Sequence, residues 1–180
     1  MRQSKGFCTG YPTPPPTFTP TPTPDPTSTP VSEKITTFLC ADDAYVSAHS
    51  PDTNFGSTQR LSMRKNEYFT YMRFNLTQLD ANARIVHSYL RLTPFELPPV
   101  SSTIKIYITA SDWQEDSITY NNRPVAQGQA GSLYVWTTTN PIEIDLTTAI
   151  QDAYAQGLPQ ISFVAEYDSS YIDLNVQSQE

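Results

Sequence analysis

The sequence has few of the residue types on which most catalytic and metal sites depend. It contains two histidines and two cysteines in 180 residues, and Cys8 and Cys40 form neither a CxxC pair nor a metal-binding constellation. His49 and His87 are isolated, and neither accompanies a recognisable serine or cysteine elbow. A glycosidase needs two carboxylates that face each other across a cleft, and no motif pairs the acidic residues. We therefore predict that the chain is not an enzyme and binds no catalytic cofactor.

Positive charge and long apolar runs are also scarce. Eleven Lys and Arg residues stand against 18 Asp and Glu, which gives a net charge of −7. Nucleic acid and anionic lipid both require a basic surface, so neither is an expected partner. No run of about 18 apolar residues exists, so no membrane span is expected. The first ten residues have a basic start with no apolar stretch behind it, so we expect no signal peptide in the sequence as it stands.

Proline and threonine dominate the beginning of the chain. Residues 11–30 hold nine Pro, seven Thr and one charged residue, Asp25. Such a segment favours extended polyproline II and spans about 60 Å. We expect an arm over residues 1–37 and a domain over 38–180. Thr/Pro-rich stalks are typical of secreted and cell-surface proteins, which predicts an extracellular or cell-surface location and O-glycans on Thr17, Thr19, Thr21 and Thr23.

The remaining sequence alternates apolar and polar residues with the period of a β-strand. The alternation occurs in short runs separated by turn clusters, which predicts an antiparallel β-sandwich. The runs are residues 60–64, 68–76, 87–92, 103–109, 134–137, 142–146, 161–166 and 171–176.

One short helix interrupts the expected strands, at residues 147–156. Ile150 and Tyr154 are spaced i, i+4 there, as on one face of a helix. Asp145 or Thr147 can cap its start, and Gly157 is expected to end it.

Four segments resemble the DNRLRE-type domain, and the resemblance covers roughly residues 38–180. They occur in the family's order, and the stretch DWQEDSITYNNRP is the most specific of them. The segments are residues 41–56, 71–76, 88–92 and 112–124. The resemblance implies a β-jelly-roll sandwich that is non-catalytic, extracellular and grouped with carbohydrate-binding modules. Some such domains are attached to polysaccharide lyases, and the resemblance implies binding of acidic polysaccharides such as alginate.

The end of the sequence departs from that family. Members continue past a Ser-Arg-Glu-like element to a further apolar strand, whereas here Ser178-Gln179-Glu180 resembles that element and ends the sequence. A sandwich without that strand would expose unpaired edges and an apolar groove, which a strand from another molecule can fill. The alternatives are that the strand is optional or that the sequence is truncated at Glu180.

The arm supplies the expected donor strand. Phe7, Tyr11 and Phe18 are candidates to dock on a neighbouring sandwich, and Cys8 is a candidate to bond another chain. A head-to-tail contact of this kind propagates into an open filament. The first functional hypothesis is therefore an extracellular structural protein that self-assembles by donor-strand complementation. The alternative is a stalked polysaccharide-binding module for acidic glycans. Whether Cys8 and Cys40 pair within or between chains is left open.

An aromatic residue beside a cation recurs on three expected strands. If these strands are neighbours, their outward faces offer rings for sugar stacking and donors for uronate carboxylates. The alternative is cross-strand packing on a solvated sheet. The pairs are Tyr71 with Arg73, Tyr89 with Arg91, and Lys105 with Tyr107. Trp113 is a further candidate, either as a sugar platform or as a core residue.

Two further sets of residues are candidates for a metal ion or a covalent glycan. Asn75-Leu76-Thr77 matches the N-glycosylation triplet, and Asn75 is expected to face outward. Two groups of carboxylates are calcium candidates, because calcium takes several oxygen ligands, although the same residues equally suit turns. These groups are Asp112 with Glu115 and Asp116, and Asp42 with Asp43 and Asp52.

Overall fold

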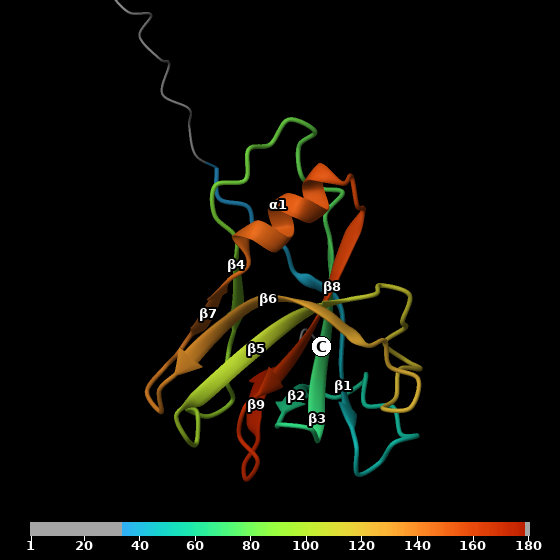
Figure 1. The fold of residues 1–180 in the computed structure, drawn as a ribbon, viewed down its shortest axis with the longest axis vertical. Coiled ribbons are helices and arrows are strands. Elements are labelled where there is room, and N and C mark those ends of the chain that lie inside the picture. The colour runs from blue at the N-terminus through green and yellow to red at the C-terminus, as the bar shows by residue number, and fades with distance from the viewer. Residues whose placement is uncertain (1–33, 179–180) are drawn as a thin grey trace, which may run out of the picture. The chain divides into compact units, whose positions relative to one another are not determined.

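The computed structural model describes residues 34–178, which form nine strands and one helix (Figure 1). The chain divides into two units, Met1–Ile35 and Thr36–Glu180, and the second holds every described element. In chain order these are β1 (Cys40–Ser47), β2 (Arg60–Met63), β3 (Tyr68–Asn75), β4 (Tyr89–Leu92), β5 (Ser102–Thr109), β6 (Ala126–Val135), β7 (Ile142–Asp145), α1 (Thr147–Ala155), β8 (Gln160–Tyr167) and β9 (Leu174–Gln177).

The first layer is a five-stranded antiparallel sheet in the order β1-β3-β8-β5-β6. Its strands follow the predicted alternation. In β5, Ile104 and Ile106 are fully buried, while Lys105 and Tyr107, which alternate with them, remain partly exposed. The alternation places one side of each strand against the core and the other side on the outer face of the sheet.

The second layer consists of two strand pairs, β2-β9 and β4-β7. The residues that follow β4 join the pairs, because the N–H of Phe95 donates to Asn175 O at 3.0 Å and the N–H of Gln177 donates to Thr93 O at 2.9 Å. Pro94 forms a bridge with Val176 between those two bonds. The two pairs therefore act as one layer, in which β9 and β4 lie next to each other.

The main hydrophobic core lies between the two layers. Side chains of β3, β5 and β8 meet side chains of β2, β4, β7 and β9, and Ala149 and Ala153 of α1 pack against the same cluster. The predicted antiparallel β-sandwich with one short helix is confirmed. The last described strand, β9, contributes the fully buried Leu174 and Val176 to this cluster. The expectation that a further strand is missing after it stays a prediction.

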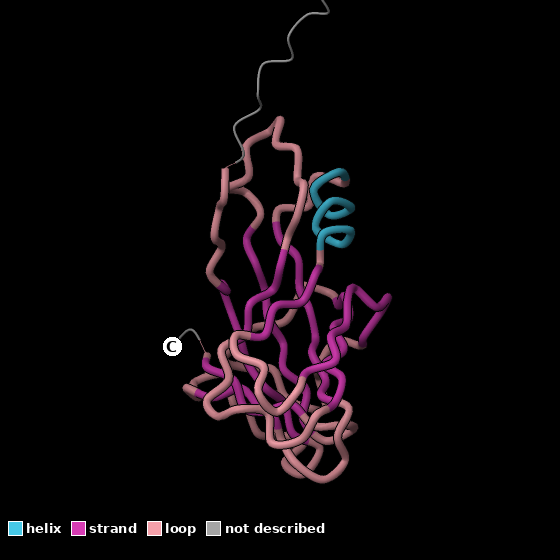
Figure 2. The backbone as a smooth tube through the Cα atoms, turned by 90° about the vertical axis from the view of Figure 1, so that its left-hand side faces the viewer, coloured by secondary structure: helices cyan, strands magenta, loops and turns pink. Residues whose placement is uncertain are grey.

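The helix ends as its sequence predicts. Gly157 adopts a φ of +67°, and the N–H groups of Gly157 and Leu158 donate to the carbonyls of Tyr154 and Ala153, both at 3.0 Å. Leu146 occupies the N-cap and offers no side-chain cap. The predicted capper Asp145 instead accepts the N–H of Thr147 at 2.8 Å from the preceding position. Figure 2 shows α1 at one end of the strands.

The outer face of the first sheet is partly covered by residues 110–125. Trp113 and Ile118 of this segment pack on Val46, Tyr71 and Val164 and form a second apolar cluster. The segment is locked to the loop after β1 at Gly56, where an added Cβ would lie 2.0 Å from Glu115 O. Only glycine permits this approach.

Residues 1–33 of the N-terminal arm lie outside the described residues. The assembly candidates Phe7, Cys8, Tyr11 and Phe18, and the O-glycosylation candidates Thr17, Thr19, Thr21 and Thr23, all belong to this segment. Filament formation through the arm therefore stays a prediction. Among the described residues, no helix has the length and apolar character that a membrane crossing requires.

Candidate functional site

The three predicted aromatic–cation pairs do not form one stripe. Tyr71 and Lys105 lie on β3 and β5 of the first sheet, which β8 separates, whereas Tyr89 lies on β4 of the second layer. The condition that the three strands are neighbours, on which the shared stripe depended, is therefore not met. The physical reason is that a two-layer fold sends successive strands to different sheets, which the alternation within each strand does not specify.

Tyr71 is not exposed, contrary to the prediction. It is 2% exposed beneath residues 110–125, its hydroxyl donates to Pro124 O at 2.8 Å, and its ring meets the Trp113 ring edge-on at 6.0 Å. Burial raises the pKa of Tyr71 to about 12. Trp113 is 5% exposed and its Nε1 donates to Ser162 Oγ at 3.2 Å. Neither ring presents a free face for stacking on a sugar.

Arg73 holds the covering segment to the sheet. Its guanidinium donates to the carboxylate of Asp42, with Nη2 at 2.6 Å and Nε at 2.9 Å. Nη1 donates to the carbonyls of Ser111 and Trp113 at 3.1 and 2.8 Å, and the group lies over the Trp113 ring. With its side chain only 11% exposed, Arg73 is positioned to stabilise the fold rather than to bind a ligand.

Lys105 and Tyr107 occupy the outer face of β5, where Tyr107 is partly buried against the second apolar cluster. Lys105 Nζ lies 2.8 Å from Asp168 Oδ2, and Lys65 Nζ lies 2.7 Å from Oδ1 of the same carboxylate. The hydrogen bond with Asp168 raises the pKa of Lys105, and the hydrogen bonds from Lys105 and Lys65 lower the pKa of Asp168. Both lysines are therefore paired with one shared carboxylate.

Tyr89 and Arg91 are the predicted pair that the structure places in solvent. They lie on the outer face of β4, where Tyr89 is 57% exposed and stacks on His87 with ring centroids 6.1 Å apart. The Arg91 side chain is 68% exposed and bonds Oε1 of Glu143 on β7. An ion pair this exposed contributes about 0–1 kcal/mol, so a ligand carboxylate can replace Glu143 at little cost.

The exposed face of β4 continues into a cleft that the sequence did not reveal. Phe95, which is 49% exposed, lines this cleft of about 810 Å³ together with Arg60, Asn175 and two acidic residues, Glu96 and Asp173. Asp173 is paired with Arg64. Tyr89 and Phe95 are six positions apart along an extended stretch of chain, a span of about 20 Å. We call Tyr89, Arg91, Phe95, Asn175 and Arg60 the β4–β9 surface.

Arg60 is the available cation on the β4–β9 surface. It is exposed, and no ion pair found among residues 34–178 includes it. Arg64, four residues further on, is by contrast paired with Glu67 and Asp173 at 2.6 and 3.0 Å. The surface thus combines an aromatic ring at each end with an unpaired guanidinium beside one of them.

Three of the carboxylates proposed to bind calcium form contacts with other side chains of the fold. Asp42 pairs with Arg73, Asp43 accepts a hydrogen bond from Ser178 Oγ at 2.7 Å, and Asp52 accepts one from Asn121 at 2.7 Å. Asp112 and Asp116 are exposed beside the half-buried Glu115. Within residues 34–178, no three His, Cys, Asp or Glu side chains gather so as to hold a metal ion, and calcium binding stays a prediction.

The predicted glycosylation residue Asn75 and the isolated His49 both form local hydrogen bonds. Asn75 is exposed as expected, and its Oδ1 accepts hydrogen bonds from the N–H and hydroxyl of Thr77 at 2.9 and 2.7 Å. Its glycosylation stays a prediction. His49 bonds Glu67 at 2.6 Å, which lowers the pKa of that carboxyl.

Cys40 is expected to be a poorly reactive thiol. Its Sγ donates to Asp42 O at 3.0 Å and Arg73 O at 3.4 Å, and burial raises its pKa to about 12. Because the thiolate is the nucleophile, iodoacetamide at pH 8.5 should alkylate Cys40 far more slowly in the folded protein than in guanidinium. Reduced Cys8→Ser protein makes Cys40 the sole thiol for mass spectrometry. Equal rates in both states would contradict the burial of the thiol. Pairing with Cys8, which lies outside the described residues, stays a prediction.

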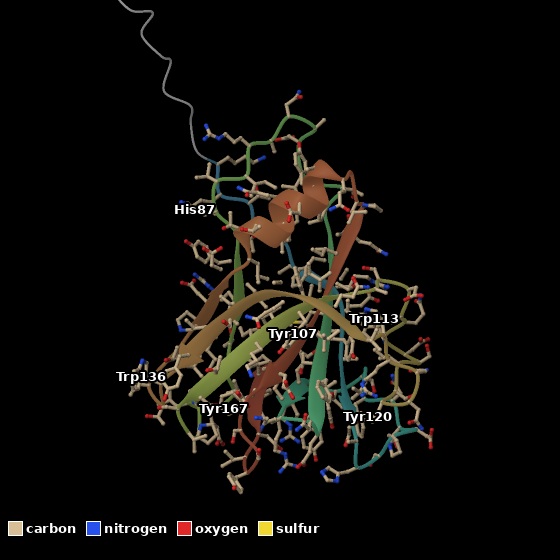
Figure 3. All side chains as sticks on the ribbon, in the orientation of Figure 1. His87, Tyr107, Trp113, Tyr120, Trp136 and Tyr167 are labelled. Carbon is tan, nitrogen blue, oxygen red and sulfur yellow. The ribbon has the colours of Figure 1, made fainter. Side chains whose placement is uncertain are left out.

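Two exposed aromatic residues escaped the sequence analysis altogether. Tyr134 at the end of β6 and Trp136 just after it are 50% and 62% exposed, with ring centroids 5.0 Å apart. Figure 3 shows Trp136 at the opposite side of the domain from Tyr120 and Trp113. The available signal was the aromatic density of Tyr134-Val135-Trp136 directly before a threonine-rich turn.

A β-sandwich that presents aromatic rings and cations on the open face of a sheet has the architecture of a carbohydrate-binding module. Comparison with family models matches residues 34–180 to carbohydrate-binding module family 96, and the chain belongs to that family. No curated protein matches the chain. The class agrees with the one that the DNRLRE-type resemblance implied, while that narrower assignment stays a prediction. Membership of a binding-module family also agrees with the expectation of a chain without catalysis.

Proposed function

We propose that this chain is a non-catalytic carbohydrate-binding protein that holds an acidic polysaccharide on its β4–β9 surface. The proposal places it outside the cell or on the cell surface, with the Thr/Pro-rich arm as a stalk. Family membership supports the ligand class. The main support for placing the binding site on this surface is the cleft that Phe95 and Arg60 both line.

The chemistry of the surface suits a chain of uronate sugars. The flat rings of Tyr89 and Phe95 can each stack on the C–H face of a pyranose, and their separation of about 20 Å matches an extended ligand rather than a single sugar. Arg60 can donate two parallel hydrogen bonds to a carboxylate, a geometry that lysine lacks. Asn175 adds an amide within the same cleft.

Affinity electrophoresis of the full chain in gels containing alginate or pectin tests this function. The wild-type protein should be retarded, and retardation should weaken with salt because screening reduces the carboxylate–guanidinium attraction. Arg60→Ala should weaken binding about 10- to 100-fold, since a hydrogen bond between charged groups contributes about 1.5–3 kcal/mol. Phe95→Ala should weaken it by a similar factor.

Arg84→Ala is the matched control for the loss of charge. Arg84 is also exposed, but it does not line the cleft, so its removal changes net charge equally and should leave binding unchanged. Equal weakening by Arg60→Ala and Arg84→Ala would show that only overall charge matters. That outcome, or no retardation in any acidic gel, would overturn the proposed site.

A further inference from the structure

Tyr134 and Trp136 form an exposed aromatic corner at the end of β6. Their ring planes meet at 75°, and both rings are at least half exposed although Val135 between them is fully buried. Apolar surface exposed side by side on two large rings is costly to leave in water, and exposed patches of this kind mark binding sites.

The corner is held in place by its own backbone. The N–H of Trp136 donates to Thr139 Oγ1, and the N–H of Thr139 donates to Trp136 O, both at 2.9 Å. These two bonds close the turn after β6, while buried Val135 anchors the strand end. The corner is therefore preorganised, which lowers the entropy cost of binding.

The surroundings of the corner are polar but carry no net charge. Ser132 and Gln129 are exposed on β6 and pair with Lys105 and Tyr107 of β5. Lys105 and Lys65 share Asp168, and Glu166 accepts the N–H of Asn66 at 2.8 Å. Two positive and two negative side chains cancel, so this outer face of the first sheet offers hydroxyl and amide partners without a free cation.

We infer that Tyr134 and Trp136 form a second glycan-binding site, which takes an uncharged polysaccharide. One ring stacks on the C–H face of a pyranose while the perpendicular ring contacts its edge. The site lies on the first sheet, whereas the β4–β9 surface lies on the second, with the core between them. This second site rests on the proposed function only because its ligand is also a glycan. With both sites, the domain can bind two glycan chains at once.

Acrylamide quenching of tryptophan fluorescence in the full chain tests the second site. The sequence holds two tryptophans, and Trp113 is buried, so quenching reports mainly on Trp136. One of three neutral probes, hydroxyethylcellulose, galactomannan or dextran, should remove most of the quenching. Tyr134→Ala should weaken that probe's affinity about tenfold, as truncation of a central aromatic contact does. Tyr171→Ala, the loss of a 94% exposed tyrosine, is the control and should change nothing.

The Arg60→Ala variant and the alginate probe distinguish this site from the β4–β9 surface. Protection of Trp136 should persist in Arg60→Ala, and alginate should not provide it. Continued quenching with all three neutral probes, protection by alginate alone, or protection that disappears with Arg60→Ala would each overturn the second site. Loss of alginate retardation would instead refute the first surface and leave the quenching result standing.

Discussion

Arg73→Ala is expected to lower the free energy of unfolding by about 2–3 kcal/mol, because hydrogen bonds to charged groups contribute about 1.5–3 kcal/mol each and this pair is mostly shielded from solvent. The substitution leaves the Asp42 carboxylate without its cation. It also removes the donors to Ser111 O and Trp113 O, so the segment over the first sheet loses its polar anchor. Urea unfolding followed by circular dichroism measures the change.

Arg91→Ala is the matched control for Arg73→Ala. Arg91 forms a similar arginine–carboxylate pair with Glu143, but its side chain is 68% exposed against 11% for Arg73. An exposed pair contributes about 0–1 kcal/mol, so the control should unfold nearly as the wild type does. Losses of equal size in the two variants would contradict the structural role assigned to Arg73.

Trp113→Ala is expected to cost about 3–5 kcal/mol, because it empties a buried site of a large aromatic side chain. The indole packs on Tyr71, and its Nε1 donates to Ser162 Oγ, which is itself fully buried. The variant therefore creates a cavity and leaves a buried hydroxyl with one bond fewer. Thermal or urea unfolding measures the loss.

Trp136→Ala removes the same side chain from an exposed position. Trp136 is 62% exposed, so its replacement should change stability by no more than about 0.5 kcal/mol. A large loss here would show that the aromatic corner belongs to the fold, and a small loss for Trp113→Ala would show that the covering segment is not packed as described. Because Arg73 lies over the Trp113 ring, the effects of Arg73→Ala and Trp113→Ala should not be additive.

The strands and the helix were predictable because they depend on local periodicity. Ile104 and Ile106 alternate with Lys105 and Tyr107 in the sequence, and burial in β5 follows that alternation. Gly157 was predictable as a helix end because few other residues adopt its positive φ.

The position of the site was not predictable, because it depends on which face of each strand another segment covers. Alternation places Tyr71 and Arg73 opposite Met72, but it does not show that residues 110–125 fold over them. Phe95 was missed for a similar reason. Pro94 ends the regular alternation, yet the chain continues beside β9 through the bonds of Thr93 and Phe95.

The most direct test of the central claim is NMR chemical-shift mapping of the full chain titrated with alginate oligosaccharides. We expect the largest amide shifts in residues 89–97 and 173–177 and at Arg60, which form and border the β4–β9 surface. Residues 110–125 should be nearly silent, because their contacts are with the sheet beneath them. Shifts confined to the turn at Asp112–Asp116, or no shifts at saturating oligosaccharide, would contradict the account.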